Sequence, residues 1–256
     1  MEMNEPAPPN AIDENRQGLI GRPMDRVDGA LKVTGRAPYA YEVKQHGEAA
    51  YGWIVEAAIG KGRLASVDTG AAERAPGVLL VMTHRNTPAQ PPYSTEGDDE
   101  RFARSWPQLS DDEVRQYGEP VAFVVADSLE QARAAAALVR IEYAPQGGDY
   151  DLQANLSKAQ RPQDESKGEP DTAEGDFNRG FEAAPVQLDV TYTTPYHIHA
   201  QMEPHASIAW WEGERLVVHC STQKLESAQK RLAHTLQLPE EQVRVVSRYI
   251  GGGFGG

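Results

Sequence analysis

Runs of apolar residues separated by polar, Gly- and Pro-rich stretches divide the first 145 residues of the chain. Short runs rich in β-branched residues, bounded by such stretches, are typical of strands. The runs that predict strands are 51–59, 78–82, 121–126 and 141–143. Strands alternating with short helices predict an α/β unit that begins near Leu19.

Helical and loop signals lie between these strands. A short Ala-rich turn of helix is predicted to end at Pro76-Gly77. Ser128 followed by Gln131 has the spacing of a capping box, which predicts a helix over 129–139. Prolines mark residues 84–118 as loop.

The pattern changes after residue 145. Gly, Asp, Gln, Lys and Pro dominate 146–180, which is typical of a linker. Alternation of apolar and polar residues over 186–192 predicts a half-buried strand. The segments 207–211 and 215–220, joined by Glu-Gly-Glu, predict a hairpin.

Helical spacing then returns before the end of the sequence. Leu225, Ala228, Leu232 and Leu236 fall on one face of a helix that Pro239 ends. Residues 243–250 predict a last strand. The whole pattern predicts an α+β protein with a tail at 1–17, an α/β domain at 18–145, a linker at 146–180 and a second unit at 181–256.

Composition narrows the function. The formal net charge is −13, with no cluster of Lys and Arg to offset it, so nucleic acid is not an expected partner. Cys220 is the only cysteine and forms no internal disulfide or Cys-based metal cluster by itself. We see no membrane span and no export signal in the sequence, which favours a cytoplasmic location, or a periplasmic one if a partner carries the signal.

The glycine-rich loop that follows the last predicted strand is the first candidate site. Its residues are Gly251, Gly252, Gly253, Phe254, Gly255 and Gly256. The spacing matches a dinucleotide fingerprint only formally, because no following helix or acidic residue is present. Glycines leave backbone N–H groups accessible, so contact with an anion or a cofactor is the natural use, and a flexible terminal segment is the alternative.

Two polar motifs precede this loop. His197, His199 and Glu203 have the spacing of metal ligands in a β-barrel dioxygenase, but the expected later His is not in a matching context. The alternative is that these residues and His205 make hydrogen bonds on a loop. Ser221-Thr222-Gln223 ends a strand before a helix, where a Ser or Thr could act simply as a cap.

Taken together, the motifs at 202–205, 221–223 and 251–256 resemble the molybdopterin-binding large subunit of the xanthine dehydrogenase and aldehyde oxidase family. Residues 28–39 and 118–122 are similar to that family's first segment and its a/b hammerhead domain. The resemblance covers residues 20–256. It implies a hammerhead domain followed by the first part of a molybdenum-cofactor-binding α/β domain.

The resemblance also implies roles for residues. The side chain of Gln223 is expected to donate a hydrogen bond to an oxo group on molybdenum, and the backbone at Gly253 and Phe254 to lie beside the metal. The other glycines of the loop are expected to bind the cofactor. Glu203 and His205 are expected to support the site, and no side chain is expected to ligate the metal directly.

The implied protein is a molybdenum hydroxylase that inserts a water-derived oxygen into an aldehyde or N-heterocycle. The chain most resembles the bacterial three-subunit aldehyde oxidoreductases, which implies a molybdopterin cytosine dinucleotide cofactor and partner subunits that carry iron–sulfur clusters and FAD. The family's chains continue well past this loop, so we expect the downstream remainder to be required and the fragment alone to be inactive. The alternatives are a non-catalytic module that docks those subunits and, more remotely, the metal-dependent dioxygenase.

Overall fold

The computed structural model describes residues 15–43, 47–92, 107–160 and 174–255. The helices, in chain order, are α1 (Gly29–Val33), η1 (Ala40–Glu42), α2 (Gly70–Glu73), α3 (Leu129–Ala136), α4 (Leu152–Asn155), η2 (Leu156–Lys158), α5 (Phe177–Ala183), α6 (Leu225–Leu236) and η4 (Glu240–Gln242). The strands are β1 (Tyr51–Glu56), β2 (Gly62–Asp68), β3 (Val78–Thr83), β4 (Glu113–Val114), β5 (Pro120–Ala126), β6 (Arg140–Pro145), β7 (Ser207–Glu212), β8 (Arg215–Cys220) and β9 (Val243–Val246). This content of helices and strands confirms the α+β class.

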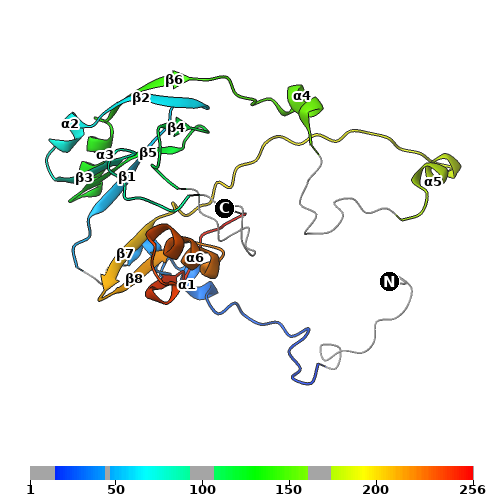
Figure 1. The fold of residues 1–256 in the computed structure, drawn as a ribbon. Helices are drawn as coiled ribbons and strands as arrows, with labels where there is room; N and C mark the ends of the chain where they lie inside the picture. The colour runs from blue at the N-terminus through cyan, green and yellow to red at the C-terminus, as the bar shows by residue number, and fades with distance from the viewer. Residues whose placement is uncertain (1–14, 44–46, 93–106, 161–173, 256) are drawn as a thin grey trace.

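The strands β1 to β6 form two antiparallel sheets, in the orders β1-β5-β3 and β4-β2-β6 (Figure 1). Helix α3 packs on one face of the first sheet, where Val124 is fully buried against Ala135. The Ser128 hydroxyl accepts the Gln131 N–H at 3.2 Å, so Ser128 caps the helix as predicted. The Gln131 side chain accepts from the Ser128 hydroxyl and not from its backbone N–H, so the reciprocal bond of the predicted capping box is not formed. Small alanines on α3 allow the helix to approach the sheet closely.

The second unit is a sheet in the order β7-β8-β9. β7 and β8 form the predicted antiparallel hairpin, and β8 runs parallel to β9 with α6 as the crossover. Leu216, Val218, Ala233 and Val243 form its core between the sheet and α6. Because β8 and β9 are parallel, the loops that follow them leave the same edge of the sheet.

The segment before β1 packs on this second sheet. η1 contacts β7 and β8, and the rings of Tyr39 and Tyr249 lie 6.0 Å apart. Lys32 of α1 lies over the same Tyr249 ring at 6.0 Å. The chain therefore contributes to the C-terminal unit first, builds the β1 to β6 unit, and then returns to the C-terminal unit. In the described part of this return, α4 and α5 are followed by residues 184–206, which form no helix or strand (Figure 1).

Several predictions about elements were wrong. Residues 184–206 contain no helix or strand, so the strand expected over 186–192 is absent. Alternation alone does not make a strand where no sheet edge is available for pairing among the described residues. β9 ends at Val246 and not at residue 250, and α3 ends at Ala136 and not at residue 139.

β2 and β4 were missed. β4 is a strand of only two residues inside the stretch predicted as loop. β2 contains an irregularity in its pairing between Leu64 and Ser66 that interrupts the alternation of buried positions. The predicted tail lies outside the described residues up to residue 14, as does Gly256 in the glycine loop.

Candidate functional site

Two loops meet at the edge of the sheet where β8 and β9 end. Cys220 ends β8 and is followed directly by Ser221-Thr222-Gln223, while Val246 ends β9 and the chain continues to the glycine loop. The pairing of His219 with Val246 places the two strand ends next to each other. Ligands of α/β proteins commonly bind at this edge, outside the carboxyl ends of parallel strands.

Gln223 and Gly253 touch across the two loops. A Cβ atom added at Gly253 would overlap the Gln223 side chain, lying 2.5 Å from its Cγ and 2.6 Å from its Oε1. Gly253 is buried, whereas Gln223 is exposed. Only a glycine permits the side-chain amide of Gln223 to lie against the backbone of the glycine loop.

The backbone of the glycine loop turns through left-handed conformations. The φ angles are +117° at Gly252, +53° at Phe254 and +96° at Gly255, and the Phe254 side chain is 75% exposed. Within the described residues, the N–H groups of residues 252–255 make no hydrogen bond to protein. Successive free N–H groups in such a turn favour the binding of an anion or an oxygen ligand.

Glu203 joins the two loops. Its Oε1 accepts the hydroxyl of Ser221 at 2.5 Å and its Oε2 accepts the N–H of Gly251 at 2.7 Å. A Cβ at Gly251 would overlap the Cβ of Glu203, so this approach also requires a glycine. The carboxylate is half-buried between the loops.

His205 does not join the site as Glu203 does, and Ser221-Thr222 does not cap the helix that follows. His205 is exposed, and no hydrogen bond to its side chain is found in the described structure. Neither Ser221 nor Thr222 caps α6, because the N-cap residue is Lys224, whose N–H donates to the Thr222 hydroxyl at 3.3 Å. The interpretation of this motif as a helix cap was therefore wrong.

Gln201 and Ser247 are contacts that sequence reasoning missed. The Gln201 side-chain amide donates to the carbonyl of Gly253 at 3.4 Å, and the Ser247 hydroxyl accepts the N–H of Thr222 at 3.5 Å. Gln201 lies outside any periodic pattern, and Ser247 lies in the run 243–250 that predicted a strand and not a contact in the site. Their proximity to the loops in sequence was the only available signal.

The dioxygenase hypothesis required a cluster of metal ligands around His197, His199 and Glu203. No group of three or more His, Cys, Asp or Glu side chains that could hold a metal ion is found within the described parts of the chain. Both histidines are exposed, and the sheets are open and three-stranded. The structure contradicts this alternative among those residues.

A cavity of about 240 Å³ lies between the ends of β8 and β9 and the segment before β1. It is lined by Glu42, His219, Cys220, Arg248 and Tyr249, among others. Burial raises the pKa of the Cys220 thiol, which favours the neutral form.

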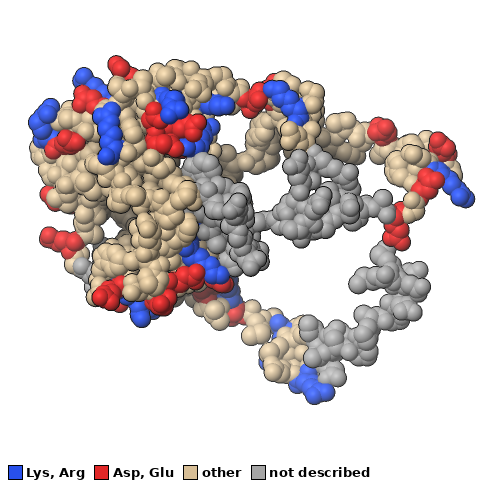
Figure 2. Space-filling view, in the orientation of Figure 1, with Lys and Arg blue, Asp and Glu red and all other residues tan. Residues whose placement is uncertain are grey.

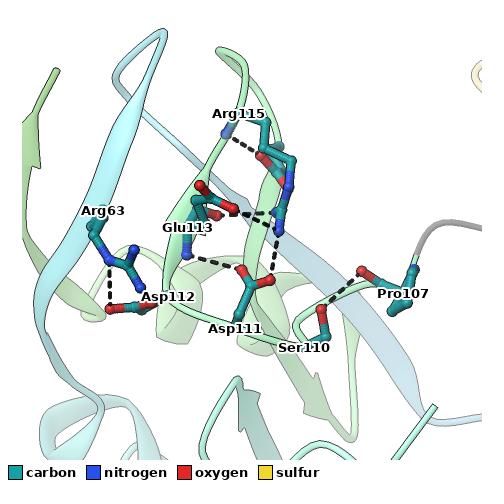
Figure 3. A network of polar contacts seen from close by, with 8 residues as sticks. Arg63, Pro107, Ser110, Asp111, Asp112, Glu113 and Arg115 are labelled. Atoms are coloured by element: carbon teal, nitrogen blue, oxygen red, sulfur yellow. Dashed lines mark hydrogen bonds and ion pairs between the residues drawn. The ribbon is translucent and has the colours of Figure 1, made fainter. Parts of the chain in front are cut away.

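A separate polar network lies on the β4-β2-β6 sheet (Figure 3). Arg115 bonds to Asp111 at 2.5 Å and to Glu119 at 2.9 Å, and Arg63 bonds to Asp112 at 2.5 Å. The hydrogen bond from Arg63 lowers the pKa of Asp112. Figure 2 shows Lys and Arg beside Asp and Glu over this unit, and the two arginines tie these carboxylates together around the loop before β4.

The fold and the paired loops define an α+β protein with a candidate ligand site at the carboxyl ends of two parallel strands. Residues 159–256 match the family model of the molybdopterin cofactor-binding domain, and residues 34–147 match that of the aldehyde oxidase and xanthine dehydrogenase a/b hammerhead domain. The chain belongs to the aldehyde oxidase and xanthine dehydrogenase family and comprises a hammerhead domain and a molybdopterin-binding region. This confirms the resemblance read from the motifs.

Two curated relatives match most or all of this chain. The chain is 45% identical over 257 residues to the aldehyde oxidoreductase molybdenum-binding subunit PaoC of Escherichia coli O157:H7, covering 100% of this chain and 33% of the relative. It is 31% identical over 239 residues to the xanthine dehydrogenase molybdenum-binding subunit of the same organism, covering 90% and 32%. The chain thus spans about a third of the length of these relatives.

Solved structures share the fold. Quinoline 2-oxidoreductase from Pseudomonas putida 86 superposes with a TM-score of 0.70 at 23% identity, covering 90% of this chain and 30% of that one. The aldehyde oxidoreductase from Desulfovibrio gigas also gives 0.70 at 23% identity, covering 90% and 27%. None of the helices in the described part of the chain is long and apolar enough to cross a membrane.

Proposed function

We propose that the loops after β8 and β9 form part of the molybdenum-cofactor site of an aldehyde- or N-heterocycle-oxidising enzyme. The observation that carries this proposal is the contact between Gln223 and Gly253, next to the free N–H groups of residues 252–255. A side-chain amide and several backbone donors converge there from two parallel strands. Such a set suits a ligand rich in oxygen and negative charge.

The residues fit a molybdopterin cofactor. Its phosphate and other oxygen groups require hydrogen-bond donors, and Glu203 takes up only the Gly251 N–H of the glycine loop, leaving the N–H groups of residues 252–255 to a ligand. The amide of Gln223 orients and polarises an oxygen acceptor of the cofactor without competing for the metal. The backbone N–H of Phe254, a residue at a positive φ, would be a further donor to the same ligand.

The bound cofactor supplies the redox chemistry, which oxidises the substrate with oxygen derived from water. The residues of this chain bind and orient it: Gln223 through its amide, and Gly252, Gly253, Phe254, Gly255 and Gly256 through their backbone. Gly251 contributes by anchoring the loop. We expect catalysis to require the polypeptide that the longer relatives have in addition to the part matched here.

The name of the aldehyde oxidoreductase subunit PaoC supports an aldehyde as substrate, and the term molybdenum-binding subunit supports a multi-subunit enzyme. We therefore propose partner subunits that carry iron–sulfur clusters and FAD and accept the electrons. We also propose the cytosine dinucleotide form of the cofactor and a cytoplasmic location, with export alongside a signal-bearing partner as the alternative. Nucleotide analysis of the released cofactor and cell fractionation test these two points.

A docking role is the second candidate, favoured by an exposed apolar face on the β1-β5-β3 sheet. Trp53 pairs with Val124 on the face covered by α3, so its neighbour Ile54 lies on the opposite face. Ile54 is 48% exposed and Leu80 is 44% exposed. Apolar residues left uncovered on one sheet face are typical of a contact surface for another protein.

The variant Gln223→Ala separates the two candidates. In the full-length subunit that contains these residues, purified with its partner subunits, we expect oxidation of aldehydes to be lost and the molybdenum content, measured by mass spectrometry, to fall. Partner binding in a pull-down is expected to persist. If the wild-type protein binds partners but contains no molybdenum, the docking role replaces the cofactor role.

A further inference from the structure

Glu203 occupies an unusual position for a residue with no regular secondary structure. It lies in the extended segment 184–206, yet its side chain is half-buried. One carboxylate oxygen accepts from Ser221, which directly follows β8, and the other accepts from Gly251, which follows β9. A single side chain thus ties together the two loops of the proposed cofactor site.

The hydrogen bond from Gly251 to Glu203 also distinguishes this backbone N–H from the other N–H groups of the glycine loop. The Gly251 N–H is bonded to Glu203, whereas the N–H groups of residues 252–255 have no protein partner in the described structure. The closeness of the Glu203 Cβ to the Gly251 backbone leaves no space for a side chain at this position. The loop is thereby anchored at its first residue and open to a ligand at the following ones.

We propose that Glu203 is a positioning residue that fixes the spacing between Gln223 and the free backbone donors before the cofactor binds. The inference rests on the proposed function and deepens it. Ser221 lies two residues before Gln223, and Gly251 lies two residues before Gly253. In each loop, the residue that bonds to Glu203 therefore lies two residues before the residue that makes the Gln223–Gly253 contact.

The length of the Glu203 side chain carries this role, more than its charge. Glu203→Gln keeps the length, because the amide oxygen can still accept the Gly251 N–H while the amide nitrogen donates to the Ser221 hydroxyl. Glu203→Asp keeps the charge but is one methylene shorter and cannot reach both loops. Ser221→Ala removes one bond, and Glu203→Ala removes both.

The experiment compares these four variants in the full-length subunit with its partners. Molybdenum per subunit is measured after dialysis against chelator, and the unfolding midpoint of each variant is recorded. Loss of a residue that orients a metal or cofactor contact typically weakens binding about 10- to 100-fold. We expect Glu203→Ala and Glu203→Asp to lose most of the molybdenum, Ser221→Ala to lose less, and Glu203→Gln to stay near wild type.

Hydrogen exchange of the cofactor-free protein gives a readout that does not depend on activity. The Gly251 amide is expected to exchange faster in Glu203→Ala and to keep wild-type protection in Glu203→Gln. Wild-type molybdenum content in Glu203→Ala would overturn the positioning role. The role would also be overturned if Glu203→Asp retained molybdenum while Glu203→Gln lost it. If the wild-type subunit itself holds no molybdenum, the proposed function fails; if wild type holds it and the Glu203 variants do too, only the positioning role fails.

Discussion

The carboxylate of Glu203 accepts the backbone N–H of Gly251 at 2.7 Å, across 48 positions of sequence. A contact of this kind connects an irregular segment to the end of a parallel βαβ unit. It shows that the glycine loop is an ordered part of the fold, held from its first residue. The alternative of a flexible terminal segment does not apply to residues 251–255.

The first prediction concerns the pairing of β1 with β5. A Cβ at Gly52 would overlap the ring of Phe123, so Gly52→Ala is expected to lower the free energy of unfolding by about 1–3 kcal/mol, as overpacking does elsewhere. Denaturant unfolding of the chain measures this. Gly147→Ala is the matched control, because no atom lies within 4 Å of a Cβ there. If Gly147→Ala lowered the free energy of unfolding as much as Gly52→Ala does, the packing argument would be contradicted.

The second prediction concerns pH. Hydrogen bonds from Lys32 and then Arg26 lower the pKa of Asp28 from 3.8 to about 2. Because the folded-state pKa is the lower one, the stabilising contribution is present above about pH 3.8 and is lost as the pH falls toward 2. An NMR titration of the Asp28 carboxyl should therefore give a midpoint near 2.

The same titration has an internal control. Lys32→Met is expected to move the Asp28 midpoint toward its ordinary value further than Arg26→Met does, because Lys32 makes the larger contribution. Since Lys32 also lies over the Tyr249 ring, its loss should loosen α1 from the C-terminal unit. A wild-type midpoint near the ordinary value would refute the ion-pair assignment.

The third prediction concerns residues 186–192. Val186 and Tyr192 are each 83% exposed, and Leu188 is 70% exposed, although the residues alternate as in a strand. We expect these residues to pair with polypeptide that the longer relatives possess, because unpaired strand backbone gains hydrogen bonds in a sheet. Their amides should exchange slowly in the full-length subunit and rapidly in the 256-residue chain.

The hairpin of β7 and β8 provides the reference for that measurement, because its amides are paired in both forms. Rapid exchange over 186–192 in the full-length subunit would show that the alternation does not reflect a strand in either context.

Elements with strong local signals were predictable from the sequence. The cap at Ser128, the apolar run of β5 and the two-residue turn between β7 and β8 all act over a few residues. β2 was missed because its irregular pairing after Leu64 breaks the period of two on which the prediction depends. The strand over 186–192 was predicted wrongly because a strand also needs a neighbour, which a pattern in one segment cannot supply.

Some features of the candidate site could likewise be predicted from the sequence, and others could not. The meeting of the loop at Gln223 with the glycine loop follows from two strands joined by a helix crossover, whose carboxyl ends lie at one edge. The hydrogen bonds of Glu203 and Gln201 could not be derived, because both residues sit in a segment whose path is set by tertiary contacts. The roles proposed for the site residues remain predictions.

The most direct test of the cofactor site is the molybdenum content of Gly253→Ala in the full-length subunit. The added Cβ would displace the Gln223 side chain, so we predict a fall in molybdenum per subunit of about tenfold or more, with normal partner binding and an unfolding midpoint close to that of Gly147→Ala. Wild-type molybdenum content in a folded Gly253→Ala protein would contradict the claim that these two loops hold the cofactor.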